Sequence, residues 1–376
     1  MTLPDTVVGI DDHPGDGPLI CVVTAGANGN RVSGLHPFFR ILGRHWPTYL
    51  LGVSPGEIYP PFRGEFGEPV LVRESRPGIL MLARIFCRIR GDAVVCFQYD
   101  PFVFFAAYLS RVLRGKPLCL MAQDWDLGFA PAYPLRSLHR LYSLRHEAYY
   151  RLAEKLARSC DLVVTSTRFL QRRLGGMRIP QGSARVVSGD SLRNRGRVAL
   201  GVEDWEVVVM WVGRPRPWKG LEELELAVSK VGESDPTVRL VVVGPGHGKE
   251  GGARYTGYVP RVEVPSLVSA CDIYAVTPRM TAFSDTQLPT KIFDGMAAAR
   301  PVVATRLSDI PRVLGRGGVY AEGGDTDRLA ELIIRLAGNP KERKKIGLIA
   351  RKIFRRWWSE ERMEERLVPA IRRMLG

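Results

Sequence analysis

The sequence has no apolar run of the roughly 18 residues that a membrane-spanning helix needs, although 45% of its 376 residues are hydrophobic. It also has no internal repeat and no low-complexity segment. The first residues, "MTLPDTVVGIDDHPGDG", contain neither a basic leader nor a small-residue cleavage site. These absences argue against a membrane-spanning or repeat protein, and we expect a cytoplasmic chain long enough for two domains.

Cysteine and histidine are both scarce, with six of each. No two cysteines form a CxxC pair, and Cys21 and Cys96 lie inside apolar runs, so we expect buried free thiols. The histidines are scattered, with neither metal-ligand spacing nor a nucleophile and acid arranged around them. The sequence therefore predicts no metal site and no cofactor.

The positive charge is unevenly distributed along the chain, whose net charge is +15. Lys and Arg outnumber Asp and Glu by 25 to 16 over residues 1–195 and by 12 to 5 over 341–376, whereas residues 196–340 are balanced at 17 to 18. This asymmetry indicates an anionic partner, which is a lipid headgroup surface, a phosphorylated acceptor or nucleic acid. A generally basic set of proteins in the source organism is the alternative explanation.

One segment of the first half combines aromatic and basic residues. The predicted helix 101–114, "PFVFFAAYLSRVLR", carries Phe102, Phe105 and Arg111. Such a helix either enters a membrane interface or packs against a sheet. With the basic excess, it leads us to expect peripheral contact with an anionic membrane.

Short runs rich in Val and Ile alternate with longer segments of helical periodicity. Continuous apolar strands that alternate with helices predict parallel sheets covered on both faces, which is an α/β fold. The predicted strands are 19–24, 48–53, 69–73, 93–98, 118–122, 161–165 and 185–188, then 206–212, 238–243, 272–276, 301–304 and 318–320. The predicted helices are 34–45, 78–90, 101–114, 135–159 and 166–174, then 220–231, 262–270, 289–299, 325–337 and 340–356.

The segment 192–204, "LRNRGRVALGVED", is polar and interrupted by glycine, which is typical of a linker, and the alternating pattern restarts after it. We therefore predict two Rossmann-like domains, residues 1–195 and 196–355. The closing segment, 356–376, is amphipathic and basic and needs a surface to pack on.

"GRPRPWKG", residues 213–220, follows the apolar run "VVVMWV" and precedes a predicted helix. Ligands of open α/β sheets bind at the carboxyl ends of strands, where helix N-termini also lie. Arg214 and Lys219 at such an end could hold a diphosphate, assisted by the helix that begins at Gly220. A solvated basic turn is the alternative.

A second polar segment, "TPRMTAFSDTQLPTKIFDGMAAARPVVAT", begins at residue 277. Pro289 is expected to open its helix, and Lys291 in the first turn opposes the helix dipole, so an anion is needed nearby. Asp294 lies on nearly the same helix face, where its carboxylate can accept hydrogen bonds from sugar hydroxyls.

These segments resemble a known family. "VGRPRPWKGLEEL", "LVVVGPG", "YTGYVP", "SACDIYAVTP" and "LPTKIFDGMAAARPVVAT" occur in the order and spacing of the retaining GT-B glycosyltransferases of family four. The resemblance implies two Rossmann-like domains whose parallel sheets face each other across a cleft, with a C-terminal helix that crosses back to the first domain. It further implies that the first domain binds the acceptor, that the second binds a nucleotide-diphosphate sugar, and that no metal is needed.

The resemblance also implies roles for single residues. Arg214 and Lys219 match the cations that neutralise the donor diphosphate and the leaving nucleotide, and Asp294 matches an acid that holds the donor ribose. The residues assigned to the donor are Gly213, Gly244, Gly246, Tyr258, Val259, Thr290, Lys291 and Asp294, with Gly29 in the glycine loop "TAGANGNRVSG" of the first domain.

The sequence departs from the family pattern at two positions. The first acid of the family's E-x7-E motif falls on Thr286, beside Asp285, and the first-domain histidine falls on Gln123. Asp124 then becomes the candidate acceptor-side catalytic group, with a turn or helix-cap role as the alternative. The tripeptide "DWD" that contains it is too short to indicate a metal site.

The sequence thus predicts a glycosyltransferase that uses a UDP- or GDP-linked sugar and retains the anomeric configuration. We expect a lipid-linked or other anionic glycan acceptor and peripheral attachment to the cytoplasmic face of a membrane. A non-catalytic partner subunit is the alternative, because Gln123 and Thr286 depart from the family. A nucleic-acid-binding protein is less favoured, because no stacking platform of aromatic and basic residues is evident.

Overall fold

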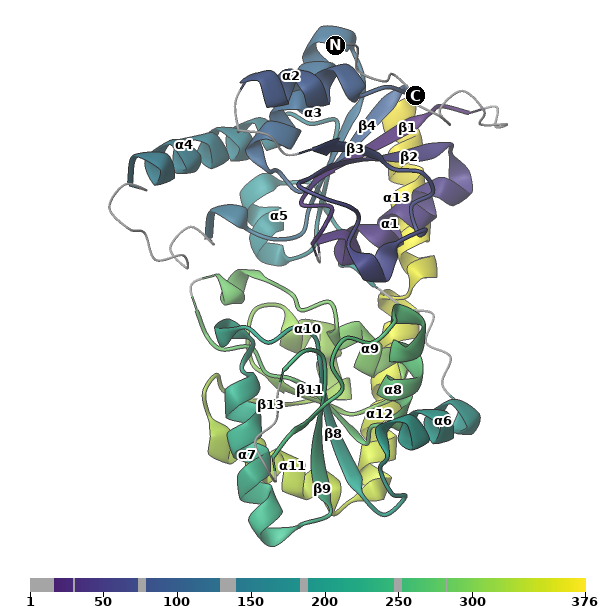
Figure 1. Cartoon of the computed structure of the whole chain (residues 1–376), viewed down its shortest axis with the longest axis vertical. Coiled ribbons are helices and arrows are strands. Elements are labelled where there is room, and N and C mark those ends of the chain that lie inside the picture. Colours follow the sequence, from purple (N-terminus) through teal and green to yellow (C-terminus); the bar gives the residue numbers. More distant parts are fainter. Residues whose placement is uncertain are drawn as a thin grey trace. The chain divides into compact units, whose positions relative to one another are not determined.

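The computed structural model of the chain describes residues 17–29, 31–73, 79–128, 140–182, 189–246, 252–281 and 283–376. It divides into two compact units (Figure 1). The first comprises residues 1–181 and 363–376, and the second comprises residues 182–362. Among the described helices, none has the length and apolarity that crossing a bilayer requires.

Over its described residues, the first unit has a seven-stranded parallel sheet in the order β3-β2-β1-β4-β5-β6-β7. Chain order reverses between β1 and β4, which are parallel neighbours with Ile20 beside Ala93. The strands are β1 (Ile20–Ala25), β2 (Thr48–Ser54), β3 (Val70–Arg73), β4 (Ala93–Phe97), β5 (Leu118–Ala122), β6 (Leu162–Thr165) and β7 (Met177–Arg178).

Helices cover both faces of this sheet. One core lies under α2 (Ile79–Arg88), α3 (Pro101–Arg114), α4 (Arg140–Ala157) and α5 (Arg168–Leu174). The other lies under α1 (Arg31–His45) and α13 (Glu360–Leu375), whose Met363, Leu367 and Ile371 are fully or almost fully buried. The C-terminal helix therefore belongs to the first unit, as the fold class implied.

The second unit repeats the architecture with a six-stranded parallel sheet over its described residues, in the order β10-β9-β8-β11-β12-β13. Here chain order reverses between β8 and β11. The strands are β8 (Val207–Val212), β9 (Val238–Val243), β10 (Arg254–Tyr255), β11 (Ile273–Val276), β12 (Val302–Thr305) and β13 (Gly318–Ala321).

Two layers of helices cover this second sheet. One face carries α7 (Leu221–Ser234) and α11 (Thr326–Ala337). The opposite core includes residues of α8 (Val264–Ala270), α9 (Ile292–Ala297), α10 (Ile310–Leu314) and α12 (Pro340–Trp357), and Leu200 of α6 (Asp190–Leu200).

The predicted fold class is confirmed, since both units are parallel α/β sheets and the expected strands within the described residues are present. The expected strand 185–188 lies outside the described residues. The two short edge strands β7 and β10 and the five-residue helix α10 were not predicted, because such short elements have no recognisable period.

The predicted linker 192–204 was wrong, because residues up to Leu200 form helix α6. Gly196 brings α6 against α8, since a Cβ added there would lie 2.1 Å from the Ser266 carbonyl oxygen. The expected boundary at residue 195 therefore falls inside a helix of the second unit, which begins at residue 182. The second unit ends at residue 362, rather than at the predicted residue 355.

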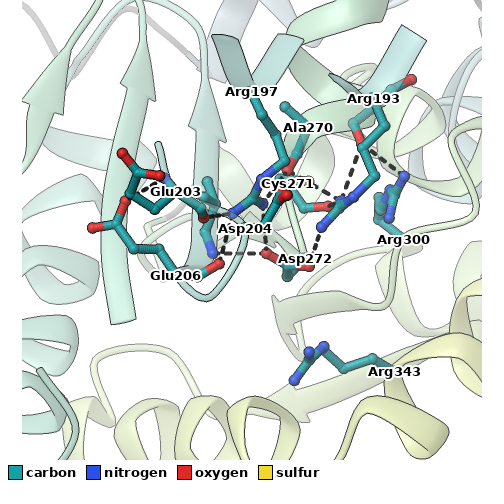
Figure 2. A network of polar contacts seen from close by, with 12 residues as sticks. Arg193, Arg197, Glu203, Asp204, Glu206, Ala270, Cys271, Asp272, Arg300 and Arg343 are labelled. Carbon is teal, nitrogen blue, oxygen red and sulfur yellow. Dashed lines mark hydrogen bonds and ion pairs between the residues drawn. The ribbon is translucent and has the colours of Figure 1, made fainter. Parts of the chain in front are cut away.

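An arginine network fixes α6 to the amino edge of the second sheet (Figure 2). Arg193 Nη2 donates to Asp272 Oδ1 at 2.8 Å, and Arg197 Nη1 donates to Asp272 Oδ2 at 3.3 Å. The Val208 amide donates to the same carboxylate at 2.9 Å. Arg193 also donates to three carbonyl oxygens at the end of α8, where the helix dipole favours a cation.

Candidate functional site

The carboxyl ends of β8 and β9 are in backbone contact. Gly213 follows β8, and its amide donates to the Val243 carbonyl oxygen at 2.9 Å. A Cβ added at Gly244, which follows β9, would lie 1.9 Å from the Gly213 carbonyl oxygen. No side chain fits between the two strand ends, so a ligand there can approach the backbone directly.

The loop 213–220 is fixed against the segment that follows β11. Thr277 Oγ1 donates to the Gly220 carbonyl oxygen at 2.9 Å, and the Arg279 amide donates to the Trp218 carbonyl oxygen at 2.9 Å. Gly220 has φ +64°, and a Cβ there would lie 1.6 Å from the Thr277 carbonyl oxygen. Because β8 and β11 flank the reversal of strand order, the loop lies where open α/β sheets bind ligands.

Two lysine ammonium groups gather at this loop. Lys219 Nζ donates to the Arg214 carbonyl oxygen at 3.0 Å, and Lys291 Nζ donates to the Val212 carbonyl oxygen at 2.6 Å. Burial lowers the pKa of Lys291 well below its usual value, and the positive charge of Lys219 lowers it further, whereas Asp294 opposes this shift. An anion bound beside both ammonium groups would relieve their repulsion.

Arg214 has a different environment from the two lysines. Arg214 is exposed, and in the described part of the chain its guanidinium forms no ion pair. The guanidinium therefore remains available for a bidentate contact with phosphate oxygens.

Helix α9 starts later than predicted. It begins at Ile292, so Lys291 is the N-cap rather than a first-turn residue, and Thr290 before it is exposed. Gly295 presses α9 onto β11, since a Cβ there would lie 2.6 Å from Cδ1 of Tyr274. Asp294, in the first turn, is half-buried, and its charge contributes to a raised pKa of Tyr274, after burial.

Thr286, at the position of the family's first acid, and the neighbouring Asp285 both form hydrogen bonds within the second unit. Thr286 Oγ1 donates to the Phe283 carbonyl oxygen at 2.6 Å and is buried. Asp285 is exposed, and its Oδ1 accepts from the Ser308 amide at 3.1 Å. Thr286 has no carboxylate, and the carboxylate of Asp285 accepts a hydrogen bond from the Ser308 amide, so neither side chain replaces the family's acid.

The remaining donor-side candidates follow β9 and β10. Gly246 packs on the Tyr255 ring, where an added Cβ would lie 2.2 Å from Cε1. Tyr258 is 62% exposed, and Val259 is partly buried against the core. These two residues thus follow β10, the edge strand that pairs with β9, and the Tyr258 side chain is open to solvent.

In the first unit, candidate residues lie at the carboxyl edge of the sheet. Gly29 closes a turn after β1, where its amide donates to the Gly26 carbonyl oxygen at 2.9 Å. Asp124 follows β5, and its Oδ2 accepts from Gln98 Nε2 at 3.3 Å. Gln123, at the position of the family histidine, is buried, and both its amide atoms have no hydrogen-bond partner among the described residues.

Sequence reasoning missed Asp126, the second acid of "DWD". Its carboxylate is buried and pairs with Arg31 Nη2 at 3.1 Å. Burial raises the pKa of Asp126 to about 7, and Arg31 opposes the shift. Nothing in the local sequence pattern distinguished Asp126 from Asp124, because its partner Arg31 lies 95 positions away.

In the described residues, no group of three or more His, Cys, Asp or Glu side chains could hold a metal ion.

Comparison with known proteins shows what this chain is similar to. The profile of the family described as "Glycosyl transferases group 1" matches residues 206–339, which confirms the resemblance seen in the sequence. Over 184 residues the chain is 28% identical to the GDP-mannose-dependent monoacylated alpha-(1-6)-phosphatidylinositol monomannoside mannosyltransferase of Corynebacterium glutamicum, covering 46% of this chain and 48% of that protein. It is 31% identical over 87 residues to the O-antigen chain mannosyltransferase B of Escherichia coli, covering 23% and 22%.

The alignments with these two curated relatives thus cover half their length or less. Solved structures match over more of the chain. HepE of Anabaena, in complex with UDP and glucose, has a TM-score of 0.74 at 18% identity and covers 94% of this chain and 98% of its own. WaaG, a glycosyltransferase involved in lipopolysaccharide biosynthesis, has a TM-score of 0.68 at 15% identity over 93% and 98%. The fold is therefore GT-B.

Proposed function

We propose that this chain, whose residues 206–339 belong to the glycosyl transferases group 1, transfers a sugar from a UDP- or GDP-linked donor to an acceptor. The observation that carries the proposal is the pair of ammonium groups of Lys219 and Lys291 beside the glycine-lined ends of β8 and β9. Both cations lie at the ligand-binding end of a parallel sheet. The names of the relatives, which include a GDP-mannose-dependent enzyme and a UDP-bound one, support a nucleotide-sugar donor.

In the proposed reaction, the bond between the sugar C1 and the terminal phosphate oxygen breaks, and a bond from C1 to the acceptor hydroxyl oxygen forms. The acceptor proton leaves with the nucleoside diphosphate, so charge and atoms balance. Lys219, Lys291 and Arg214 stabilise the negative charge that develops on the leaving phosphate. In this proposal the protein supplies the required cations, the acceptor binds to the first unit, and the product keeps the donor's anomeric configuration.

The donor is identified by nucleotide binding. Thermal unfolding is measured with UDP, GDP and their sugars after treatment with EDTA, because a ligand at about 100 times its Kd adds about 2.7 kcal/mol of stability. We expect one nucleotide series to raise the melting temperature. No response to either series would contradict the proposal.

Turnover by the isolated chain distinguishes an enzyme from a non-catalytic partner subunit. With the identified donor, we expect transfer to an acceptor or slow hydrolysis of the donor. The anomeric configuration of the product, read from NMR coupling constants, tests retention. Nucleotide binding without any turnover would favour the partner subunit.

We further propose that the acceptor is lipid-linked or otherwise anionic, and that the chain attaches peripherally to the cytoplasmic face of a membrane. The basic composition and the relatives that act on a phosphatidylinositol mannoside and in lipopolysaccharide biosynthesis support this. Extraction of cell membranes tests it, since a peripheral protein is released by high salt.

A further inference from the structure

One side of α12 is a basic surface. Lys341, Lys344, Lys345, Lys352, Arg355 and Arg356 are exposed. In the described part of the chain, none of these six side chains forms an ion pair with an acid. The acid within α12 is Glu342, which lies 3.6 Å from Arg335 of α11. Since spacings of three and four residues share a helix face, these cations form a stripe, here called the basic stripe.

The opposite side of α12 is fixed to the core of the second unit. Ala350 and Phe354 are buried in it, and a Cβ added at Gly347 would lie 2.0 Å from the Ala299 carbonyl oxygen. The helix therefore cannot rotate to hide its charges. Its 18 residues present the stripe on a rigid rod of about 27 Å.

At the C-terminal end, the stripe borders a shallow hollow of about 480 Å³. Its lining consists of Leu348, Arg351, Lys352, Arg355, Arg356 and Arg362, so every polar side chain in it is basic. Leu348, within this lining, is 45% exposed. Trp357 is 55% exposed at the end of α12, but it lies outside the lining, on the helix side of the buried Ala350 and Phe354. The guanidinium of Arg356 lies 5.1 Å from the Trp357 ring centroid.

We propose that the basic stripe, with Leu348, is the surface by which this chain docks on an anionic lipid bilayer, an inference that rests on the peripheral attachment proposed above. Each Lys or Arg near an anionic leaflet adds to the attraction. The exposed Leu348 among them suits the interface between headgroups and acyl chains. A single-stranded nucleic acid would instead need a series of aromatic rings for stacking, whereas the exposed aromatic residue on α12 is Trp357.

The structure weighs against the helix that the sequence offered for this role. In α3, Val103, Phe104, Ala106 and Ala107 are buried in the core of the first unit. Phe102 and Phe105 pack against Tyr149 of α4, with ring centroids 6.5 and 6.3 Å apart. The aromatic residues near the start of α3 are thus packed against the protein itself, whereas Val112 and Leu113 at its C-terminal end are exposed.

Sedimentation with lipid vesicles tests the proposal without requiring any enzymatic activity. The full chain is mixed with vesicles of phosphatidylcholine alone or of phosphatidylcholine with phosphatidylglycerol, at low and physiological salt. We expect binding to the anionic vesicles, weakened by salt. In the triple variant Lys344→Gln, Lys345→Gln, Lys352→Gln, we expect the partition coefficient to fall about tenfold or more.

A second triple variant, Lys230→Gln, Arg239→Gln, Arg328→Gln, is the matched control, because it removes the same charge from exposed sites elsewhere on the second unit. We expect it to bind vesicles as the native chain does. Equal losses in both triple variants would show a mere effect of net charge and overturn the proposal. So would absence of vesicle binding by the native chain, or tighter binding to DNA than to vesicles at the same salt.

Leu348→Ala provides an independent readout that charge alone would not move. We expect this variant to lose binding at high salt, where apolar insertion contributes most, and Leu226→Ala, at a residue of α7 that is 59% exposed, to leave it unchanged. Identical behaviour of the two leucine variants would contradict insertion of Leu348.

Discussion

The ammonium of Lys291 lies 3.6 Å from the centroid of the Trp211 ring, at the end of β8. The ring contributes a cation–π attraction, and the Val212 carbonyl oxygen accepts a hydrogen bond from the same ammonium at 2.6 Å. A Cβ added at Gly213 would lie 3.3 Å from this Nζ. The glycine therefore leaves room beside a cation that the strand itself holds in place.

Replacement of Lys219 by alanine tests the proposed stabilisation of the leaving group. We expect turnover to fall about a hundredfold or more, by analogy with the loss of one oxyanion donor, which removes about 3–4 kcal/mol of transition-state stabilisation. Steady-state kinetics and a melting curve are compared with those of Lys230→Ala, an exposed lysine on α7. Near-normal turnover of Lys219→Ala would refute the assigned role.

Proton uptake on donor binding follows from the lowered pKa of Lys291. A bound diphosphate favours the charged ammonium and so raises this pKa. At a pH between the two pKa values, binding takes up a proton, and the affinity for the nucleotide falls as pH rises. Isothermal calorimetry in buffers of different ionisation enthalpy measures the uptake, which should disappear in Lys291→Met. Identical heats in all buffers would contradict the prediction.

Two glycines of the same region of the chain should respond oppositely to alanine. Gly220→Ala meets the Thr277 carbonyl oxygen and a left-handed backbone, so we expect a loss of more than about 2 kcal/mol in the free energy of unfolding. At Gly232, inside α7, an added Cβ meets no atom within 4 Å. Gly232→Ala should gain about 0.5–1 kcal/mol. Urea titrations measure both, and a neutral Gly220→Ala would show that the loop is not fixed as described.

The arginine network of Figure 2 should depend on its central acid. Asp272→Ala leaves Arg193 and Arg197 without their carboxylate and the Val208 amide without an acceptor, so we expect a loss of about 3–5 kcal/mol in unfolding free energy. Asp327→Ala, in an exposed pair with Lys230, should lose less than about 1 kcal/mol. Similar losses in the two variants would contradict a buried network.

Because the pKa of the buried Asp126 is raised, we expect the stability of the fold to depend on pH. Its pKa rises from an ordinary 3.8 to about 7 in the folded chain, so the folded state binds a proton that the unfolded state releases. Its contribution to stability therefore falls as pH rises from about 4 to about 7, by at most about 4 kcal/mol. Asp126→Asn should flatten the curve of unfolding free energy against pH over this window. Parallel curves for the native chain and the variant would exclude the raised pKa.

The strands and the order of the helices were predictable because each depends on nearby residues. The continuous apolar run "VVVMWV", for example, predicts a buried strand, and β8 is buried over nearly its whole length. The donor-side loops were predictable for a similar reason, since glycines and cations directly follow β8 and β9.

Apart from the short elements β7, β10 and α10, the features that the sequence did not reveal depend on distant partners. Arg193 and Arg197 make the sequence of α6 as polar as that of a linker. Asp272, with which both pair, lies 79 positions after Arg193 and 75 after Arg197. Asp126 looked equivalent to Asp124 until Arg31 was placed beside it. The depressed pKa of Lys291 likewise depends on burial against β8, which no local pattern encodes.

The packing of α13 has a consequence during synthesis. Met363, Leu367 and Ile371 complete an apolar core of the first unit, yet they are translated after all of residues 182–362. At about 5–20 residues per second, a nascent chain leaves the part of this core that α13 covers exposed for roughly 10–40 s, while α1 covers the rest of the face. Chaperones that bind apolar surface have this interval in which to act, and ribosomes that stall before residue 363 leave that part of the core exposed.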